Sequence, residues 1–510
     1  MLRNKRAMRR FGAVAVSLAL VTAACGGDDD AGSGPEETGG GGDTGGGEET
    51  AETGGDTGGG DTGGEETATG GGDTGGGGSG DRTTVTWFVG LGTGSQEEQI
   101  PQQQALIDEY NANQDEIFLE VQFVDNNTAK DALATLIGGG TPPDIVGPVG
   151  REGANAFPGE WLDLSELIES EGVDLSLYEQ TQVDAYTNPD GTVHSLPFAS
   201  FPSALYYNTE LFDEAGLPYP PAEYGEPYGV GTEWEGDWDW AKVEELSQIL
   251  TVDANGNDAT SPDFDPSSIQ QWGYTHQWTA APKAQGTNFG AGNIMAEDGT
   301  ADVPDQWVEE WKWYHNLIHN LHSSPTGEQL DGDILSGNAF NSGKVAMART
   351  HLWYTCCLTD ADGNGNTFWN VAAVPSHNGV VTANLHADTF RVHKDTANAE
   401  AALAVLKWIQ EEKALEFLTI YGAMPARTDL RDPYFAALEE RFPQGVSWQT
   451  FLDGLQYIDN PSHELDMPAF AESDLRIKEL EPLINNDADL DIDAYVEQLE
   501  ADLDAIWANA

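Results

Sequence analysis

Apolar and polar positions in the first third of the chain follow a strand–helix–strand rhythm. Apolar or alternating runs predict strands at 85–89, 118–124 and 144–146. Between them, apolar residues at helical spacing predict helices over about 100–110 and 129–137, the second ending at three glycines. This order is typical of a parallel α/β sheet, whose ligands bind beyond the carboxyl ends of its strands.

The last residues of the chain carry a second helical pattern. Over 493–507, the apolar residues Tyr495, Val496, Leu499 and Leu503 fall on one face. We expect an amphipathic helix here, with Asp493 as its N-cap.

The first 24 residues have the pattern of a secretory signal peptide. Five basic residues within positions 3–10 precede an apolar run, 11–21, that is too short to span a bilayer as a stable helix. Thr22-Ala23-Ala24-Cys25 resembles the lipobox of bacterial lipoproteins, although Leu is more usual at the first place. The resemblance implies cleavage before Cys25 and lipid on its sulfur. Ordinary signal cleavage that leaves a spare thiol is the alternative.

Residues 25–82 are predicted to be a disordered tether behind that cysteine. Positions 26–80 hold 26 of the 60 glycines and 14 acidic residues, without any Lys, Arg or aromatic residue, and so cannot bury a core. The remaining chain of about 430 residues is long enough for two lobes.

Acidic residues dominate the whole chain, whose formal net charge is −65. This balance argues against a nucleic-acid binder and a polybasic membrane-surface protein, since both need basic groups. From residue 81 onward, 73 acidic residues stand against 17 basic ones, an excess too broad for one site. We expect an acidic, halophilic-type surface; a surface that collects cations is the alternative.

Several short motifs follow one another in a specific order. They are Gly-Thr-Pro-Pro-Asp-Ile-Val (140–146), Leu-Tyr-Tyr-Asn (205–208), Phe-Asn-Ser-Gly-Lys-Val-Ala-Met (340–347) with Trp353 six places later, Val-Ala-Ala-Val-Pro (371–375) and Tyr-Gly-Ala-Met-Pro-Ala (421–426). In this order they resemble the extracellular solute-binding lipoproteins of ABC sugar importers, family 1, of the maltose-binding-protein type. The resemblance covers about residues 84–505.

The resemblance implies an α/β protein with a two-lobed, periplasmic-binding-protein-like fold of type II. Each lobe would be a mixed sheet with helices on both faces. The first lobe would comprise 83–200 plus 388–424, and the second 201–387 plus 425–510. The lobes would close about crossing segments near 200–204 and 384–390, because a ligand that touches both favours the closed form.

The implied function is that of a binder and not an enzyme. The protein would capture a mono- or oligosaccharide outside the membrane and deliver it to the permease subunits of an ABC transporter. It would be a monomer on the outer face of the cell membrane, anchored by lipid only, and it would need no cofactor.

A sugar offers hydroxyl rims and apolar faces, so its contacts should be polar or aromatic side chains. Trp353 and Tyr354 are the expected stacking residues from their motif position, with core packing as the alternative. At Gly92, Thr93 and Ser95 we expect a helix N-terminus with free N–H donors, or else an ordinary turn. The other candidate ligand-binding residues are Trp278, His276, Gln277, Arg151, Ser200, Phe201, His386 and Asp388.

Cys356 and Cys357 are adjacent and lie in a chain with an export signal. Export places them where disulfides persist. We expect a vicinal disulfide beside Trp353 that faces the cleft; two reduced, buried thiols are the alternative.

Two patterns resemble metal sites, but we expect no bound metal at either. His315, His319 and His322 have the spacing of one helical face, next to an apolar stripe, which is typical of a helix boundary. The segment from Asp360 to Gly365 matches the first half of a calcium loop but has Val371 where glutamate is required, and we interpret it as a turn.

Two other functions stay open. A secreted glycoside hydrolase would need two carboxylates that face one cleft, and 87 acidic residues do not exclude such a pair. The chain has no Gly-x-Ser-x-Gly, His-Glu-x-x-His or phosphate-loop motif, however. A binder of a polyamine, a peptide or a glycerol phosphate ester is the other alternative.

Overall fold

The computed structural model describes residues 82–510 except 171, 179–182, 184–190 and 361–362. Contacts divide the chain into two units, residues 1–75 and 76–510, and the described residues belong to the second. The predicted signal peptide (1–24), the lipidation site Cys25 and the tether up to residue 81 lie outside the described residues.

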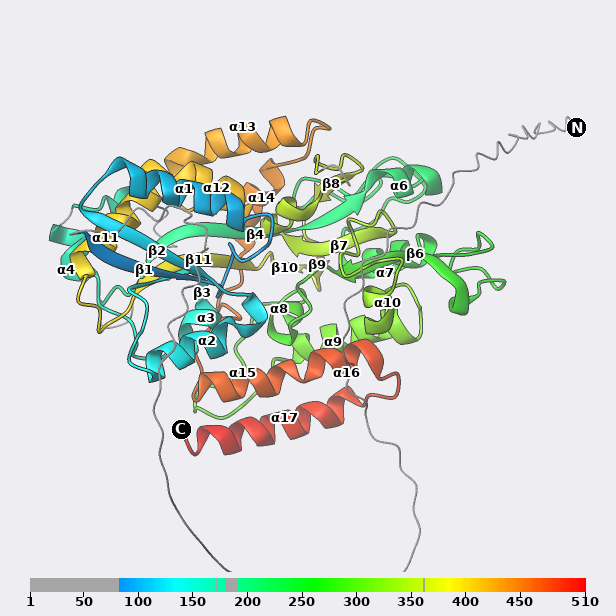
Figure 1. Ribbon diagram of the computed structural model, residues 1–510. Coiled ribbons are helices and arrows are strands. Elements are labelled where there is room, and N and C mark those ends of the chain that lie inside the picture. Colours follow the sequence, from blue (N-terminus) through cyan, green and yellow to red (C-terminus); the bar gives the residue numbers. More distant parts are fainter. Residues whose placement is uncertain (1–81, 171, 179–182, 184–190, 361–362) are drawn as a thin grey trace, which may run out of the picture. The chain divides into compact units, whose positions relative to one another are not determined.

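Strands and helices alternate through most of the described chain (Figure 1). The strands are β1 (Thr83–Val89), β2 (Ile117–Phe123), β3 (Ile145–Gly150), β4 (Leu196–Asn208), β5 (Val252–Asp253), β6 (Ile269–His276), β7 (Val345–His351), β8 (Trp369–Ala372), β9 (Ser376–His377), β10 (Val380–Val381), β11 (Leu385–Val392) and β12 (Met424–Pro425). The α-helices are α1 (Ile100–Asn113), α2 (Asn126–Gly138), α3 (Arg151–Asn155), α4 (Ser165–Ser170), α6 (Thr209–Ala215), α7 (Trp240–Ile249), α8 (Pro282–Gly286), α9 (Asp305–His319), α10 (Gly327–Asp331), α11 (Ala399–Lys407), α12 (Ala414–Tyr421), α13 (Arg431–Arg441), α14 (Gln449–Gly454), α15 (Phe470–Lys478), α16 (Leu480–Asn486) and α17 (Ile492–Trp507).

The main sheet is mixed and runs in the order β2-β1-β3-β11-β4-β7-β6-β5, with β8 and β12 also paired to β4. We call β2, β1, β3 and β11 the first half of the sheet, and β7, β6, β5 and β8 the second half. In the first half, β1 pairs in parallel with β2 and β3, as the sequence pattern predicts. In the second half, β6 and β7 are parallel.

Helices cover both faces of the first half of the sheet, because side chains of β1 alternate between two cores. Val85, Trp87 and Val89 pack with α1, α11 and α12, while Phe88 packs with α2 on the other face. Figure 1 shows α1 and α12 on one side of these strands and α2 and α3 on the other.

The second half of the sheet also has a core on each face. One core joins β7 to α7, α9 and the C-terminal helices α15–α17, and the other joins it to α13 and α14. The C-terminal helix is present as predicted, but its N-cap is Asp491, whose carboxylate accepts from the N–H of Ala494. Asp493 instead forms an ion pair with Lys312, so its assignment as the cap is wrong.

Strand β4 connects the two halves. Its residues 196–202 pair with β11, and residues 203–208 pair with β7 and β8. All 13 residues of β4 are buried. The change of partner falls between Pro202 and Ser203, within the segment 200–204 predicted as a crossing.

A buried arginine fastens two of the chain segments at this crossing. Arg349 of β7 donates to the hydroxyl of Ser203 at 2.7 Å and to the side-chain oxygen of Asn384, the residue before β11. The hydroxyl of Ser203 donates in turn to the carbonyl of Asn384 at 2.7 Å. Burial lowers the pKa of Arg349 to about 10. At neutral pH the guanidinium therefore remains charged, and its hydrogen bonds stabilise the crossing.

Replacing Arg349 should destabilise the folded chain, because Ser203 and Asn384 would lose their charged hydrogen-bond donor. We expect Arg349→Met to lower the free energy of unfolding by about 1–3 kcal/mol, because a buried acceptor loses its charged donor. Arg349→Lys should cost less, since it keeps the charge but loses the planar fork. Urea denaturation measures both. Lys344→Met, an exposed change just before β7, is the control, and an equal loss there would contradict this role for Arg349.

Candidate functional site

The turn after β1 is joined to β11 through Asp388. Its carboxylate accepts from the backbone N–H and the hydroxyl of Thr93, both at 3.0 Å. A Cβ at Gly92 would lie 2.6 Å from that carboxylate, so glycine is required there. Burial is the main cause that raises the pKa of Asp388 to about 6.

The expected helix N-terminus at this turn is wrong. Helix α1 begins only at Ile100, and the N–H of Thr93 is already taken by Asp388. The N–H of Gly94 donates to the side-chain oxygen of Gln99 at 2.9 Å. Ser95 lies in the same turn and is half-buried. These two backbone donors therefore hold the protein together and are not free for a ligand.

Trp353 lies where the two halves of the sheet meet, on the 3-10 turn η3 (Leu352–Cys357) that follows β7. Its half-buried ring stacks on His351, with ring centroids 4.2 Å apart. It contacts Phe201 of β4 and His386 of β11 edge-on, at 5.4 and 5.1 Å. The structure thus brings together three of the predicted residues, Trp353, Phe201 and His386.

Trp278 and Tyr354 form a second aromatic pair, at 5.3 Å and edge-on. Tyr354 is buried, and its hydroxyl donates to the side chain of Asn338. Core packing, the alternative interpretation, therefore describes Tyr354. Trp278 is 50% exposed, and its indole N–H donates to the carbonyl of Gly337 at 3.0 Å. Trp278 thus presents a fixed aromatic surface to solvent.

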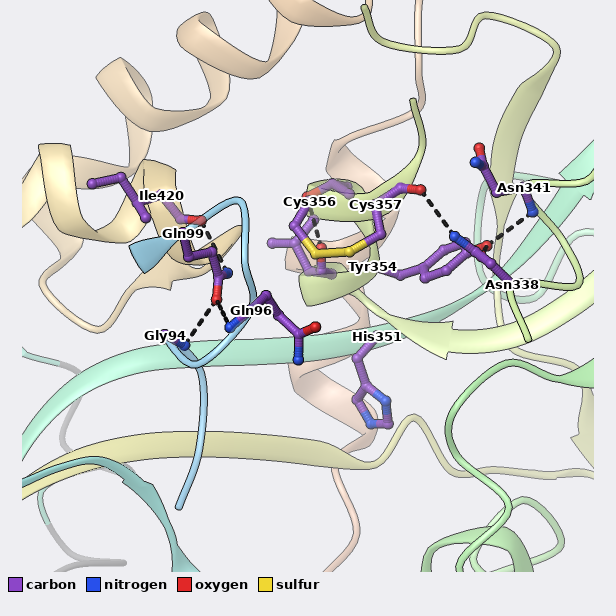
Figure 2. The surroundings of a disulfide bond; sticks show 12 residues. Gly94, Gln96, Gln99, Asn338, Asn341, His351, Tyr354, Cys356, Cys357 and Ile420 are labelled. Atoms are coloured by element: carbon purple, nitrogen blue, oxygen red, sulfur yellow. Dashed lines mark hydrogen bonds between the residues drawn. A yellow bond between two sulfur atoms is a disulfide. The ribbon is translucent and has the colours of Figure 1, made fainter. Parts of the chain in front are cut away.

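A disulfide bond joins Cys356 and Cys357 within η3. Figure 2 shows this pair between the turn that carries Gln96 and the ring of Tyr354. Asn338 donates to the carbonyl of Cys357 at 3.3 Å, which ties the disulfide to the segment beside Trp278. Both cysteines are partly exposed.

Other predicted residues have their side chains inside the protein. Ser200 and Phe201 of β4 are buried, and Gln277 accepts from the N–H of Phe340 at 3.0 Å. His276 and Glu310 lie 3.1 Å apart, and burial lowers the pKa of the histidine and raises that of the glutamate. Burial thus disfavours the charged form of both groups. The local sequence around His276 and Gln277 did not show that β6 ends inside the core.

Arg151 begins α3 and is half-buried, and the next residue, Glu152, enters a network that sequence reasoning missed. Glu152 lies 2.8 Å from Lys283 of α8 and 3.4 Å from Lys478 of α15. Asp474 of α15 lies 2.7 Å from Lys478 and 3.7 Å from Lys283. We call Glu152, Lys283, Asp474 and Lys478 the junction charge cluster.

The junction charge cluster links α3, beside the first half of the sheet, to helices packed on the second half. Burial by itself would raise the pKa of Glu152, but Lys283 and Lys478 together lower it well below its usual range. Glu152 is therefore ionised at neutral pH. No local motif marks these residues, because their positions are far apart in the sequence.

A second group that sequence reasoning missed lies around His386. Nε2 of His386 and Nε2 of His463 are 3.2 Å apart, and Nδ1 of His386 is 3.3 Å from Glu464. Nδ1 of His463 lies 2.7 Å from Asp459. We call His386, His463 and Glu464 the histidine cluster. Burial would lower the pKa of His386, but Glu464 raises it above its usual value.

The three histidines singled out by their spacing do not form a cluster. Helix α9 ends at His319, and His322 lies beyond it with a positive φ of 55°. His315 contacts the carbonyl of Asp487 at 2.8 Å, and His319 that of Ile484 at 2.9 Å. The expected single face is wrong at His322, whereas His315 and His319 pack against the C-terminal segment, as a helix boundary does.

Two further features of the described residues bear on the site. A cavity of about 500 Å³ lies beside α7, lined by Trp234, Glu244, Glu245 and Asp258 among others. Its lining comes from α7 and from the loops before and after it in the chain, and no residue of the first half of the sheet contributes. Among the residues with described structure, no helix combines the length and apolar character needed to cross a membrane.

Comparison with known proteins identifies the family of the chain. A sequence model described as bacterial extracellular solute-binding protein matches residues 94–416. Proteins of Brucella abortus and Brucella suis, named only as binding proteins, are 23% identical over 255 residues, which is 48% of this chain and 54% of each relative. The chain spans about half the length of these curated relatives.

Solved structures share the fold over nearly all of their length. An ABC substrate-binding protein of Listeria monocytogenes, in complex with cycloalternan, is 22% identical with a TM-score of 0.64, over 83% of this chain and 99% of the other. A solute-binding protein of Agrobacterium radiobacter with ribitol is 18% identical (TM-score 0.63; 83% and 98%). The sugar-binding protein MalE of Xanthomonas citri is 16% identical (TM-score 0.61; 84% and 98%).

The junction charge cluster should make stability depend on pH. The pKa of Glu152 is lower in the folded state than its reference value of 4.5. Its stabilisation is therefore complete above that value and is lost as the pH falls toward the folded pKa. We expect Glu152→Gln to cost about 2–4 kcal/mol at pH 7 and to flatten the loss of stability between pH 5 and 3.

Thermal and urea unfolding across this pH range test the prediction. Glu166→Gln, a change at an exposed glutamate of α4, is the matched control. If both variants have the same pH profile as the parent chain, the cluster does not stabilise the junction.

Proposed function

Because the chain belongs to the family of bacterial extracellular solute-binding proteins, we propose that it captures a sugar outside the membrane as the substrate-binding component of an ABC importer. The chain has the two-lobed α/β fold of type II binding proteins, of the maltose-binding-protein type. Similar structures hold cycloalternan and ribitol, and these ligands support a carbohydrate as the solute here.

The proposed first lobe is 83–200 plus 388–424, and the proposed second lobe is 201–387 plus 425–510. The change of partners along β4 and the pairing of β12 with Ser200 and Ala199 support crossings at these boundaries. A solute that touches both lobes would favour closure by its differential affinity for the closed form. The junction charge cluster would stabilise the same closed arrangement.

The solute is proposed to bind beside η3, where Trp353 and the disulfide are partly exposed. Trp353 would stack on an apolar face of the sugar, and Trp278 would supply a second aromatic surface. Arg151 would donate to hydroxyl groups, and His386 would support the ring of Trp353 edge-on. Tyr354 and His276 would support this surface from the core, because both are buried. The single observation that carries the proposal is the placement of Trp353 between β4, β7 and β11, where the two halves meet.

The same proposal covers the attachment to the membrane, the oligomeric state, the permease partner and the surface charge. Cys25 would carry lipid, and residues 26–82 would tether the folded unit to the outer face of the cell membrane. The protein would act as a monomer and deliver its solute to a permease. The 73 acidic residues of the folded unit would form a solvated surface suited to high salt.

A thermal-shift screen in high salt tests the proposed function. Mono-, di- and oligosaccharides come first, followed by polyamines, peptides and glycerol phosphates. A ligand at 100 times its Kd should stabilise the chain by about 2.7 kcal/mol. A shift with an unchanged sugar supports the binder. Consumption of the sugar would indicate a hydrolase, and a shift only with a charged compound would discard the sugar as solute.

Aromatic substitutions should reduce affinity for the sugar identified in that screen. We expect Trp353→Ala to weaken binding about 10- to 100-fold and Trp278→Ala about 10-fold, because each removes a stacking surface. Isothermal titration calorimetry measures the Kd. Trp353→Phe retains a ring and should recover part of the loss, which separates stacking from damage to the fold. Trp234→Ala, in the cavity beside α7, is the control; an equal effect there would contradict the proposed position.

A further inference from the structure

The histidine cluster has the arrangement of a metal-binding site. His386 comes from β11, whereas His463 and Glu464 come from the segment before α15. One potential ligand atom from each of the three lies within 4.8 Å of the other two. His463 and Glu464 are 4% and 5% exposed. Two imidazoles and a carboxylate are thus held close together, with His463 and Glu464 buried and 23% of the His386 side chain exposed.

The two imidazoles direct the same kind of nitrogen at each other. Nδ1 of His463 faces the carboxylate of Asp459, and Nδ1 of His386 faces that of Glu464. A carboxylate accepts hydrogen bonds, so each Nδ1 that faces one is a donor, and Nε2 is the nitrogen of each ring left to hold a proton or a metal ion. The two Nε2 atoms are 3.2 Å apart, so either a proton or a metal ion is shared between them.

The separation of these nitrogens fits metal coordination. Two nitrogens bound at 2.0–2.1 Å in a tetrahedral site lie roughly 3.3 Å apart. Metal-ligating histidines commonly donate their other ring N–H to a carboxylate, which orients the ring. Asp459 has that position for His463 and also accepts from the backbone N–H groups of Leu385 and His463, at 3.1 and 2.8 Å.

A third imidazole lies next to the cluster without an ordinary partner. The ring centroid of His351 is 4.6 Å from that of His386, and the residue is fully buried. Neither of its ring nitrogens has a hydrogen bond of normal geometry among the described residues, although the side chain of Asn384 lies close by. A buried, unsatisfied polar side chain beside a ligand set indicates a partner that the protein itself does not supply.

We propose that Nε2 of His386 and Nε2 of His463 bind a divalent transition-metal ion of the Zn²⁺ type, while Glu464 and Asp459 orient the two rings through their Nδ1 atoms. Imidazole nitrogens are ligands that zinc prefers, and the remaining positions of a tetrahedral site would be open to water. A bound ion would fasten β11 to the segment before α15. This site differs from the sequence-based expectation of no metal, and it does not depend on the nature of the proposed sugar.

Zinc titration of the metal-stripped chain tests the proposal. After treatment with EDTA and dialysis, calorimetry at pH 7.5 and high salt should show one Zn²⁺ per chain, unaffected by excess Mg²⁺. Co²⁺ should give visible absorption bands of a four- or five-coordinate site. His386→Gln and His463→Gln should each weaken binding at least about 30-fold, and Glu464→Gln about 10-fold.

Controls separate this site from other causes of zinc binding. His315→Gln, at a histidine packed against the C-terminal segment, should leave affinity unchanged. Circular dichroism and thermal unfolding of each metal-free variant show whether it is folded, and Glu464→Gln serves if a histidine variant is not. Absence of stoichiometric binding by the parent chain would overturn the proposal and leave a proton shared by the two imidazoles. Unchanged affinity in both folded histidine variants would also overturn it.

The result is independent of the proposed sugar function. The same screen of sugars is run on the metal-free and the zinc-loaded chain. Failure to bind sugar would leave the zinc stoichiometry intact, and failure to bind zinc would leave any sugar affinity of the metal-free chain intact.

Discussion

Strand β4 is the constraint on which the arrangement of the folded unit depends. Its 13 residues are all buried, and its pairing changes from β11 to β7 and β8 after Pro202. Because a single continuous strand serves both halves of the sheet, the halves are joined in a fixed register. The carboxyl end of β7 therefore reaches η3 beside β11, and Trp353 contacts residues of both crossing strands.

The junction also gathers charges of a kind that the chain has in short supply. Only 17 basic residues stand against 73 acidic ones from residue 81 onward, yet Lys283, Lys478 and Arg349 all lie at or near the crossing. With so few basic residues, most acidic residues of this chain cannot have a lysine or arginine partner of their own. Glu152 instead has two lysine partners and Asp474 has three, which offsets the cost of burying them between the two halves.

Much of the fold could be predicted from the sequence because the relevant signals are local. The period of two over 85–89 and the helical period over 129–137 need only neighbouring residues, and both elements are present. Strand β4 itself is less apparent, since its fully buried course shows no alternation. The cap of α17 was misplaced by two residues because Asp491 and Asp493 are equally good caps by composition, and only the backbone geometry selects one.

The candidate site was less predictable because long-range pairing assembles it. Trp353 and His386 could be named from motif and crossing positions. His463, however, lies 77 residues from His386 in the sequence, and Glu152 is 131 residues from Lys283. No spacing rule connects such residues.

The end of β7 places the proposed solute surface next to the proposed metal site. His351 is the last residue of β7 and faces His386, while Trp353 and the Cys356–Cys357 disulfide follow at once on η3. Trp353 stacks on His351, so a solute that moved the tryptophan ring would press directly on the ring next to the histidine cluster. The proposed solute surface and the proposed metal site are thus neighbours across one stacked pair of rings, although each is tested with its own ligand.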